Sequence, residues 1–237
     1  MKVCILTLFP ELFAPFWDHG IIRRAVQGKK LDPLTVNIRD HAKGRHRVTD
    51  DRPYGGGCGM VMKPDPLTAA LSAARAQVPG ATTLLLSPQG RPFDQALARS
   101  LAERDALIFV CGRYEGVDER FIDRYVDAEI SIGDFVLTGG ELGAMVIVDA
   151  VARLIPGVLG NQDSAESDTF SDGLVEYAHY TRPPVFDDQR VPDVLLSGNH
   201  HAIDRWRAEN ALIRTLLKRP DLLEQRHLSA EEREILK

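Results

Sequence analysis

Short apolar segments alternate with helical patterns along the first two thirds of this chain of 237 residues. Glycine, proline or charged residues bound most of these segments, which is typical of strands, at 3–8, 34–38, 82–86, 106–111 and 129–132. Helical patterns at 66–77, 93–103 and 117–125 lie between several of them. This alternation indicates parallel β-α-β units. We therefore expect an α/β domain with a parallel sheet that binds its ligands at the carboxyl ends of the strands.

The last third of the chain has a different pattern. A polar segment follows Gly160, and from about Val191 the sequence turns helical, with apolar positions on one stripe at Ile203, Trp206, Ile213, Leu216 and Leu217. Ser229, followed three residues later by Glu232, fits a capping box before a last short helix. The sequence therefore predicts an α/β domain at 1–159, a mobile linker at 160–173 and a small helical domain at 174–237.

Three loops of unusual composition each leave a predicted strand at the edge where a ligand would bind. They are LSPQGRPF at 86–93, CGRYEGVDER at 111–120 and SIGDFVLTGGE at 131–141. The chain contains no GxxxxGK[ST], GxGxxG, HExxH or GxSxG motif. The absence of these motifs disfavours the common nucleotide-binding folds and hydrolase active sites. Glycine lets the backbone approach a ligand closely, although Gly90, Gly112 or Gly116 taken singly suits a simple turn. Together, the three loops favour a binding site.

Charge and cysteine usage limit the other possibilities. The formal net charge is -5, so binding to a polyanion would depend on local clusters of Lys and Arg. Cys4, Cys58 and Cys111 are far apart without a ligand-type spacing, which favours buried thiols over a zinc site or a disulfide framework. No apolar run is long enough for a membrane helix, and the N-terminal segment is typical of a core strand. We expect a cytoplasmic protein that does not contact a membrane.

Basic residues cluster in two parts of the sequence. The first cluster lies between Arg39 and Arg52, and the second lies between Arg182 and Arg219, with the aromatic residues Tyr180 just before it and Trp206 within it. Phosphate contact and base stacking are one interpretation, and a solvated surface with Trp206 in the core is the other. The glycine run at 55–59 would let the backbone approach a bulky ligand, or it is only a loop.

The helical segment from Gly139 to Ile155 is apolar nearly all round, which predicts a buried helix. Arg153 near its carboxyl end would complement the helix dipole, a structural role. Asp168 lies in the polar segment, where a carboxylate is usually just solvated. From the residues alone, neither side chain stands out as catalytic.

The ordered strings of this sequence resemble the bacterial tRNA (guanine-N1)-methyltransferases, which belong to the trefoil-knotted (SPOUT) methyltransferase superfamily. The resemblance covers nearly the whole chain and rests on LFP at 8–10, RPYGGGCGM at 52–60, the three loops above, HYTRP at 179–183 and LLSGNH at 195–200. The chain departs from the family pattern at Cys58, where proline is expected, and at Phe135, where tyrosine is usual. Neither departure removes an obvious catalytic group.

The resemblance implies that the three loops form a deep trefoil knot, a rare exception to unthreaded chains, and that the knot binds S-adenosylmethionine mainly through backbone groups. It also implies a homodimer with each active site shared between subunits. The implied cofactor site comprises Leu86, Ser87, Pro88, Gly112, Tyr114, Glu115, Gly116, Ser131, Ile132, Gly133, Asp134, Phe135, Val136, Leu137, Gly139 and Gly140. The expected RNA-binding residues are Gly55, Gly56, Gly57, Arg182, His200 and Arg205.

The same resemblance gives Asp168 and Arg153 catalytic roles in methyl transfer to N1 of the guanine 3′ of the anticodon. Guanine N1 carries a proton, so a general base must remove it, and Asp168 would be that base. Arg153 would stabilise the negative charge that develops towards O6. The target base must leave the stacked anticodon loop, with the helical domain holding the stem of the tRNA. The resemblance also implies a magnesium ion, although no carboxylate cluster in the sequence indicates a metal site.

Three other functions fit parts of the sequence. The nearest alternative is a knotted methyltransferase that acts on ribose or on ribosomal RNA. The strings SDTF at 167–170 and HYTRP at 179–183 argue against this alternative. A noncatalytic RNA-binding protein would explain the basic clusters but not the three loops. A flavodoxin-like metabolic enzyme would explain the α/β pattern but not the basic C-terminal third.

Overall fold

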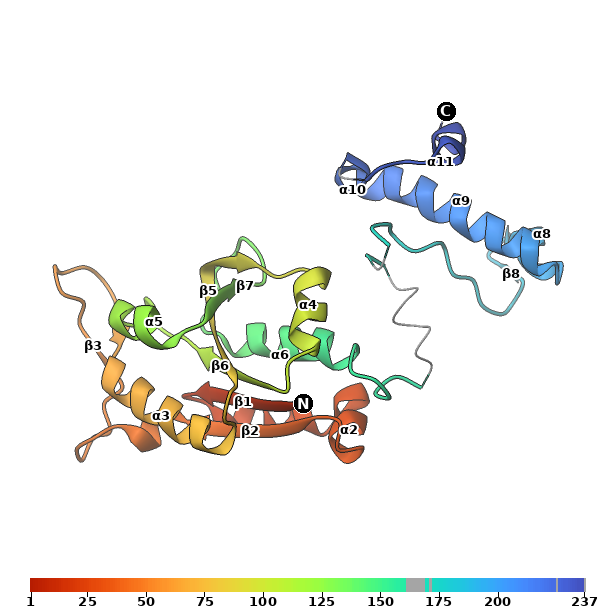
Figure 1. Ribbon diagram of the computed structural model, residues 1–237. Helices are drawn as coiled ribbons and strands as arrows, with labels where there is room; N and C mark the ends of the chain where they lie inside the picture. The colour runs from red at the N-terminus through yellow and green to blue at the C-terminus, as the bar shows by residue number, and fades with distance from the viewer. Residues whose placement is uncertain (161–168, 171, 225, 237) are drawn as a thin grey trace. The chain divides into compact units, whose positions relative to one another are not determined.

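The computed structural model describes residues 1–160, 169, 170, 172–224 and 226–236 of the chain. The chain divides into two compact units, Met1–Gln162 and Asp163–Lys237. The first unit contains the sheet and the second is mainly helical, so each is described by itself below (Figure 1).

The first unit is built on a parallel sheet of five strands in the order β2-β1-β6-β5-β7 (Figure 1). Their bounds are β1 Lys2–Thr7, β2 Asp32–Asn37, β5 Thr82–Pro92, β6 Ala106–Cys111 and β7 Ala128–Ser131. The five apolar runs of the sequence form these strands. The prediction of an α/β domain with a parallel sheet is therefore confirmed.

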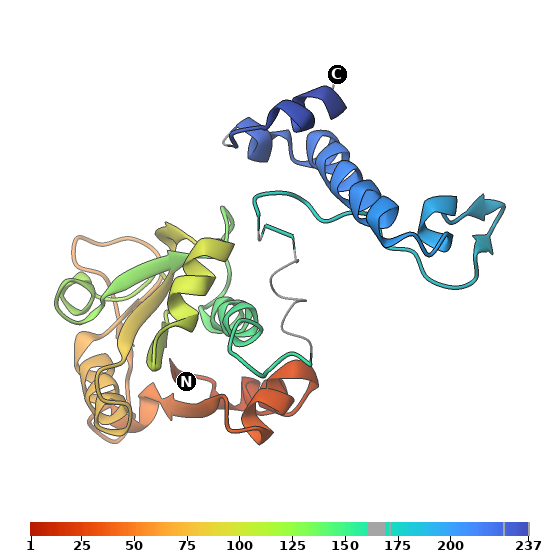
Figure 2. The ribbon, with the colours of Figure 1, turned by 45° about the vertical axis from the view of Figure 1, so that its right-hand side comes forward.

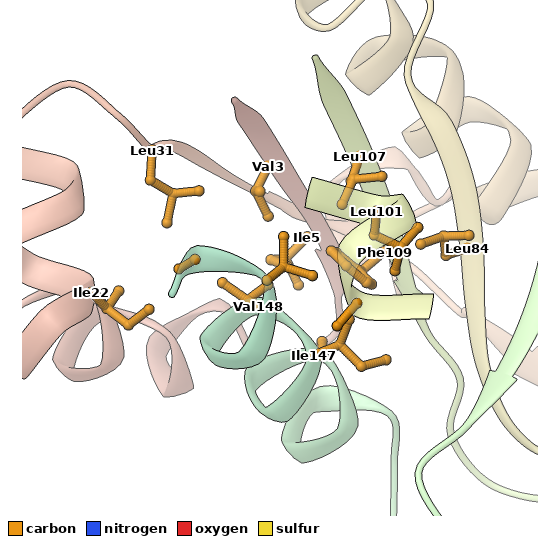
Figure 3. Packing of buried hydrophobic residues seen from close by; sticks show 14 of the residues in the cluster. Val3, Ile5, Ile22, Leu31, Leu84, Leu101, Leu107, Phe109, Ile147 and Val148 are labelled. Atoms are coloured by element: carbon orange, nitrogen blue, oxygen red, sulfur yellow. The ribbon is translucent and has the colours of Figure 1, made fainter. Parts of the chain in front are cut away.

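Alternate residues of the central strands point into two separate cores, because successive side chains of a strand face opposite sides of the sheet. Val3, Ile5 and Phe109 belong to one core, whereas Cys4 and Leu6 belong to the other. The first core packs against helices α2 (Gly20–Gln27), α4 (Gln95–Ala102) and α6 (Glu141–Ala152), with Ile147 and Val148 directed at the sheet (Figure 3). The second packs against α3 (Pro64–Gln77) and α5 (Glu119–Tyr125), so α3 and α6 cover opposite faces (Figure 2).

The helices α4 and α5 begin later than the sequence pattern indicates, because an aspartate caps each of them. The Asp94 carboxylate accepts a hydrogen bond from the Leu97 amide at 2.7 Å, and the Asp118 carboxylate accepts one from the Arg120 amide at 3.1 Å. Aspartate is a favoured N-cap because its oxygen satisfies an amide that the helix leaves unpaired.

Strand β5 continues through the segment expected to be a loop. Leu86 and Arg91 both pair with Ile130, so residues 87–90 bulge out of the ladder and pairing with β7 then resumes to Pro92. Gly90 allows this contact, because a Cβ atom there would lie 2.4 Å from the backbone of Glu129 and Ile130. Gly90 therefore permits a close approach rather than a turn. The expectation of a plain loop at 86–93 is wrong in this respect.

Short elements complete the first unit: the 3-10 helices η1 (Pro10–Leu12) and η2 (Ile38–His41), helix α1 (Ala14–Trp17), and the strands β3 (Asp50–Asp51) and β4 (Val61–Met62). The segment around β4 also pairs with the loop after β6. The Met62 amide donates to the Gly116 carbonyl at 2.9 Å, and the Glu115 amide donates to the Met60 carbonyl at 3.0 Å. The glycine run is thereby anchored to the loop at 111–118.

Two expectations for the first unit are wrong. Helix α6 is not buried all round, because Leu142 is 58% exposed and Val146 is 48% exposed; the sheet covers one face of the helix and leaves this one open. Cys58 is exposed rather than buried, because it lies in the glycine run, away from either core. Cys4 and Cys111 are buried on strands β1 and β6, as expected.

The described part of the second unit contains α8 (Asp193–Leu196), α9 (His200–Lys218), α10 (Pro220–Glu224) and α11 (Ala230–Ile235), with a hairpin of β8 (Val185–Phe186) and β9 (Gln189–Arg190). The capping box of Ser229 and Glu232 is confirmed. The apolar stripe predicted on α9 is wrong at Ile213, Leu216 and Leu217, which are exposed. Leu212 and Thr215 are buried instead. The Thr215 hydroxyl oxygen accepts a hydrogen bond from the Val175 amide at 2.9 Å, which packs the segment around Val175 against this face of α9. None of the described helices is long and apolar enough to cross a membrane.

Candidate active site

A cavity of about 320 Å³ lies at the bulge of β5 and at the carboxyl ends of β6 and β7. The three loops singled out in the sequence form its walls. All but one of the residues expected to bind a cofactor line it: Leu86, Ser87, Pro88, Gly112, Tyr114, Glu115, Gly116, Ser131, Ile132, Gly133, Phe135, Val136, Leu137, Gly139 and Gly140. Asp134 is the exception and is not among the lining residues. The position of this cavity is the one that parallel α/β sheets offer to ligands.

Backbone atoms form much of the cavity wall because side chains cannot fit there. A Cβ atom on Gly140 would lie 2.9 Å from the Cα of Cys111 and 2.9 Å from the Cβ of Leu86. This closeness lets the Gly140 amide donate to the Gly112 carbonyl at 3.0 Å, which joins the loop after β7 to the loop after β6. This part of the cavity wall is therefore main chain, and the pairing of these two peptide groups holds the neighbouring loops together.

The two loops also contain backbone conformations that are uncommon away from functional sites. Tyr114 has a φ of 59°, a left-handed conformation that costs free energy for a residue with a Cβ atom. Gly116 and Gly133 have φ angles of 133° and 148°, which glycine adopts without that cost. The Ser131 hydroxyl fixes the second turn, accepting from the Gly133 amide at 3.2 Å.

Sequence reasoning missed several residues of the cavity wall, including Arg113, Thr138 and Gly143. Arg113 forms an ion pair with Glu141, with its Nη2 atom 2.9 Å from Oε2. The two residues are separated by 28 positions, so no local spacing rule links them. The sequence contains one signal for this pair, which is a glutamate at the start of a helix whose only other charged residue is Asp149.

Two thiols, those of Cys4 on β1 and Cys111 at the end of β6, are buried and have raised pKa values. Burial raises the pKa of Cys4 to about 12. Burial also raises the pKa of Cys111 above its ordinary value, and the nearby negative charge of Glu141 raises it further. Since the thiolate is the reactive form, neither cysteine is suited to act as a nucleophile.

The structure places one of the two expected catalytic residues. Arg153 is exposed at the C-cap position of α6, consistent with the expected interaction with the carboxyl end of that helix. Asp168 lies outside the described residues. Among the residues that are described, no group of three or more His, Cys, Asp or Glu side chains could hold a metal ion.

The glycine run lies in the connection between β3 and β4. Gly55, Gly56 and Gly57 are exposed and have φ angles of 84°, 81° and 118°. Tyr54 beside them is 99% exposed. Most of the first basic cluster is exposed in the preceding segment: Lys43, Arg45, His46, Arg47 and Arg52. One of these, Arg47, is paired with Asp40 at 2.8 Å.

The second basic cluster belongs to the helical unit, and four of its arginines are paired with acids. Arg205 bonds to Glu209 at 2.8 Å, and the other three pairs are Arg190–Asp193, Arg207–Asp204 and Arg219–Asp221. Arg182 and His200 are exposed, at the segment before β8 and at the start of α9. Trp206 is half-buried, with its ring 6.3 Å from that of Tyr180.

The fold and the cavity define a parallel α/β protein with a ligand site made largely of backbone and with a helical unit after it. The family model described as tRNA (Guanine-1)-methyltransferase TrmD matches residues 1–225. The chain therefore belongs to the tRNA (guanine-1)-methyltransferase family, whose members are tRNA-modifying enzymes.

Curated relatives match along almost the whole chain. A protein named tRNA (guanine-N(1)-)-methyltransferase from Syntrophotalea carbinolica is 57% identical over 98% of this chain and 94% of its own length. Proteins of the same name from Geobacter metallireducens and Pseudomonas fluorescens are each 56% identical over 100% of this chain, and over 96% and 95% of their own lengths. The match spans both units.

Proposed function

We propose that this enzyme transfers the methyl group of S-adenosylmethionine to N1 of the guanine that lies immediately 3′ of the anticodon, position 37 of tRNA. The observation that carries this proposal is the backbone-lined cavity at the bulge of β5 and the carboxyl ends of β6 and β7. Family membership supplies the tRNA guanine as the methyl acceptor.

The cavity suits S-adenosylmethionine in size and chemistry. Its volume of about 320 Å³ is within the usual range for small-molecule sites, which is roughly 300–1,000 Å³. Peptide groups around Gly112, Gly133 and Gly140 suit the adenine edge, while Tyr114 and Glu115 offer a ring face and a negative charge to the sulfonium and ammonium groups. The threading of these loops into a trefoil knot is part of the proposal.

Asp168 and Arg153 would carry out the chemistry at the guanine. The methyl donor supplies an electrophilic methyl group, so no nucleophilic side chain is needed. The Asp168 carboxylate removes the proton from N1, and the Arg153 guanidinium stabilises the negative charge that develops towards O6. Within the part of the chain that the structure describes, the His, Cys, Asp and Glu side chains do not gather into a group that fits the magnesium ion implied by the resemblance.

Two exposed regions would hold the tRNA. In the helical unit, Arg182 and His200 have exposed side chains, and Arg205 can exchange Glu209 for a phosphate. In the first unit, the exposed glycines at 55–57 let the backbone approach an extruded base. A tRNA substrate also implies that the enzyme acts in the cytoplasm.

The enzyme would act as a homodimer with active sites shared between subunits. Leu142 and Val146 form an exposed apolar strip on α6, and Phe9 and Leu12 near the end of β1 are 43% and 47% exposed. Apolar side chains gathered in this way are typical of subunit interfaces. Sedimentation of the purified chain at several concentrations measures the oligomeric state, and a monomer at every concentration would contradict this part of the proposal.

Transfer of labelled methyl from S-adenosylmethionine tests the proposed function. The substrates are unmodified tRNA transcripts with guanine 3′ of the anticodon and matched transcripts with adenine at that position. We expect label only in the guanine transcripts, recovered as 1-methylguanosine. Label recovered in a ribose or at another base would contradict the proposal.

A further inference from the structure

Three side chains from separate segments meet in a buried network beside the cavity. The Thr7 hydroxyl, at the end of β1, donates to Oε1 of Glu141 at 2.7 Å. Arg113, in the loop after β6, donates from Nε to the same oxygen at 3.3 Å. Thr7 is fully buried, Glu141 is 1% exposed, and the Arg113 side chain is 19% exposed.

This network is more than a cap on helix α6. An acidic side chain in the first turn interacts favourably with the helix dipole even when it is exposed, so this interaction does not require burial. A buried ion pair, by contrast, gains little net stability over apolar residues, because both charges lose their hydration. Glu141 Oε2 makes no aligned hydrogen bond and is held by the charge of Arg113 alone. The geometry of the Arg113–Glu141 ion pair therefore points to a role in holding the two side chains in place, rather than to a gain in the free energy of unfolding.

Arg113 connects the two backbone walls of the cavity. Besides its contacts with Glu141, it donates from Nη1 to the Thr138 carbonyl at 3.1 Å. Its backbone forms a bridge with Gly139, where a Cβ atom would lie 2.2 Å from the Arg113 Nε atom. Arg113, Thr138, Gly139 and Gly140 all line the cavity. The guanidinium thus sets the distance between the loop at 112–116 and the loop at 137–140.

The network also includes the LFP string, which the proposed chemistry does not use. The Phe9 amide donates to the Thr7 hydroxyl oxygen at 2.9 Å, and the Arg113 guanidinium lies 4.4 Å from the centre of the Phe9 ring. The aromatic face and the carboxylate together hold the guanidinium in one orientation. The end of β1 is therefore joined to both cofactor loops.

We propose that Thr7, Arg113 and Glu141 are positioning residues that fix the spacing of the two loops gripping the methyl donor. This inference rests on the proposed function for the identity of the donor. It does not rest on that function for the contacts of Arg113 that join the two loops.

The first test is calorimetric titration of S-adenosylmethionine into the full-length Glu141→Gln variant, which keeps the shape of the side chain and removes its charge. We expect the dissociation constant to rise about tenfold, with little change in the KM for tRNA. Arg113→Lys keeps the charge and loses the planar fork, so it should give an intermediate effect. Asp40→Asn, which breaks the exposed pair with Arg47, is the matched control and should bind the donor as the wild type does.

The second test needs no ligand. Hydrogen exchange of backbone amides at 112–116 and 137–140 should become faster in Glu141→Gln while the amides of β1 and β6 stay protected. Thr7→Val, compared with Thr7→Ser, provides the same test if Glu141→Gln fails to fold, because valine keeps the shape and removes only the hydroxyl.

The outcomes separate the two proposals. Unchanged exchange and unchanged donor affinity in the variants would overturn the positioning role. Faster exchange in the variants, with no donor binding even by the wild type, would support the positioning role and contradict the proposed function instead.

Discussion

The two units of this enzyme differ in how their interiors are made. The first unit buries apolar side chains on both faces of its sheet and adds a buried charged network at the cavity. In the described part of the second unit, the buried side chains are only Leu174, Leu212 and Thr215. The first unit can thus hold a preformed site for a small molecule. The second suits a large, charged partner that supplies much of its own contact surface.

The charged groups follow the same division. Glu141 and Arg113 of the first unit are withdrawn from water, so their geometry is fixed by the fold. Pairs such as Arg205–Glu209 in the second unit are exposed, so each contributes little stability and can exchange partners. Salt should therefore affect binding of tRNA far more than binding of the methyl donor.

The largest expected effect concerns Asp168, the proposed general base, which lies outside the described residues. Asp168→Asn keeps the shape of the side chain and removes the proposed base, so turnover should fall by roughly 10²–10⁴-fold. Donor affinity, measured by calorimetry, should stay as in the wild type. Full turnover in Asp168→Asn would show that another group removes the proton from N1.

Leu212→Ala tests whether the second unit depends on its few buried side chains. Removing a buried leucine leaves a cavity, and the free energy of unfolding of this unit should fall by about 2–5 kcal/mol. Differential scanning calorimetry should show a lower Tm for the part of the transition that belongs to the second unit. The affinity for the methyl donor at room temperature should be unchanged. A parallel loss of donor affinity would mean that the two units fold as one.

Gly140→Ala tests the backbone wall of the first unit. The added methyl group would lie 2.9 Å from atoms of Cys111 and Leu86, and overpacking of this kind costs about 1–3 kcal/mol. We expect donor binding to weaken by roughly tenfold to a hundredfold. Gly80→Ala is the control, because a Cβ atom there meets nothing within 4 Å, although its φ of 74° adds some strain.

The smallest effect concerns the cap of α5. A side-chain hydrogen bond from Arg120 lowers the pKa of Asp118 in the folded protein. The ionised carboxylate therefore stabilises the fold at pH values above its pKa in the unfolded chain. This stabilisation is lost as the pH falls through the pKa of the folded state. Asp118→Ala should cost about 1 kcal/mol at neutral pH. Thermal unfolding should show this difference shrinking in acid below about pH 4. A difference that grows in acid would contradict the assignment.

The sequence predicted the sheet and the cavity walls because both follow from local signals. Short apolar runs bounded by glycine, proline or charged residues identified all five strands, and glycine-rich strings identified the loops around Gly112 and Gly140. The pairing of Arg113 with Glu141 was not predictable, since it depends on how distant segments meet. The exposure of apolar faces on α6 and α9 was not predicted for a related reason. An apolar stripe in the sequence identifies the apolar face of a helix, but it does not say which segment packs against that face.

Titration of S-adenosylmethionine into the full chain without tRNA measures whether the first unit alone holds a site for the methyl donor. We expect saturable binding by the first unit, with the same affinity in Arg182→Ala, a variant of the second unit that should weaken only tRNA binding. Binding that appears only after tRNA is added, or that is lost in Arg182→Ala, would contradict the division between the two units.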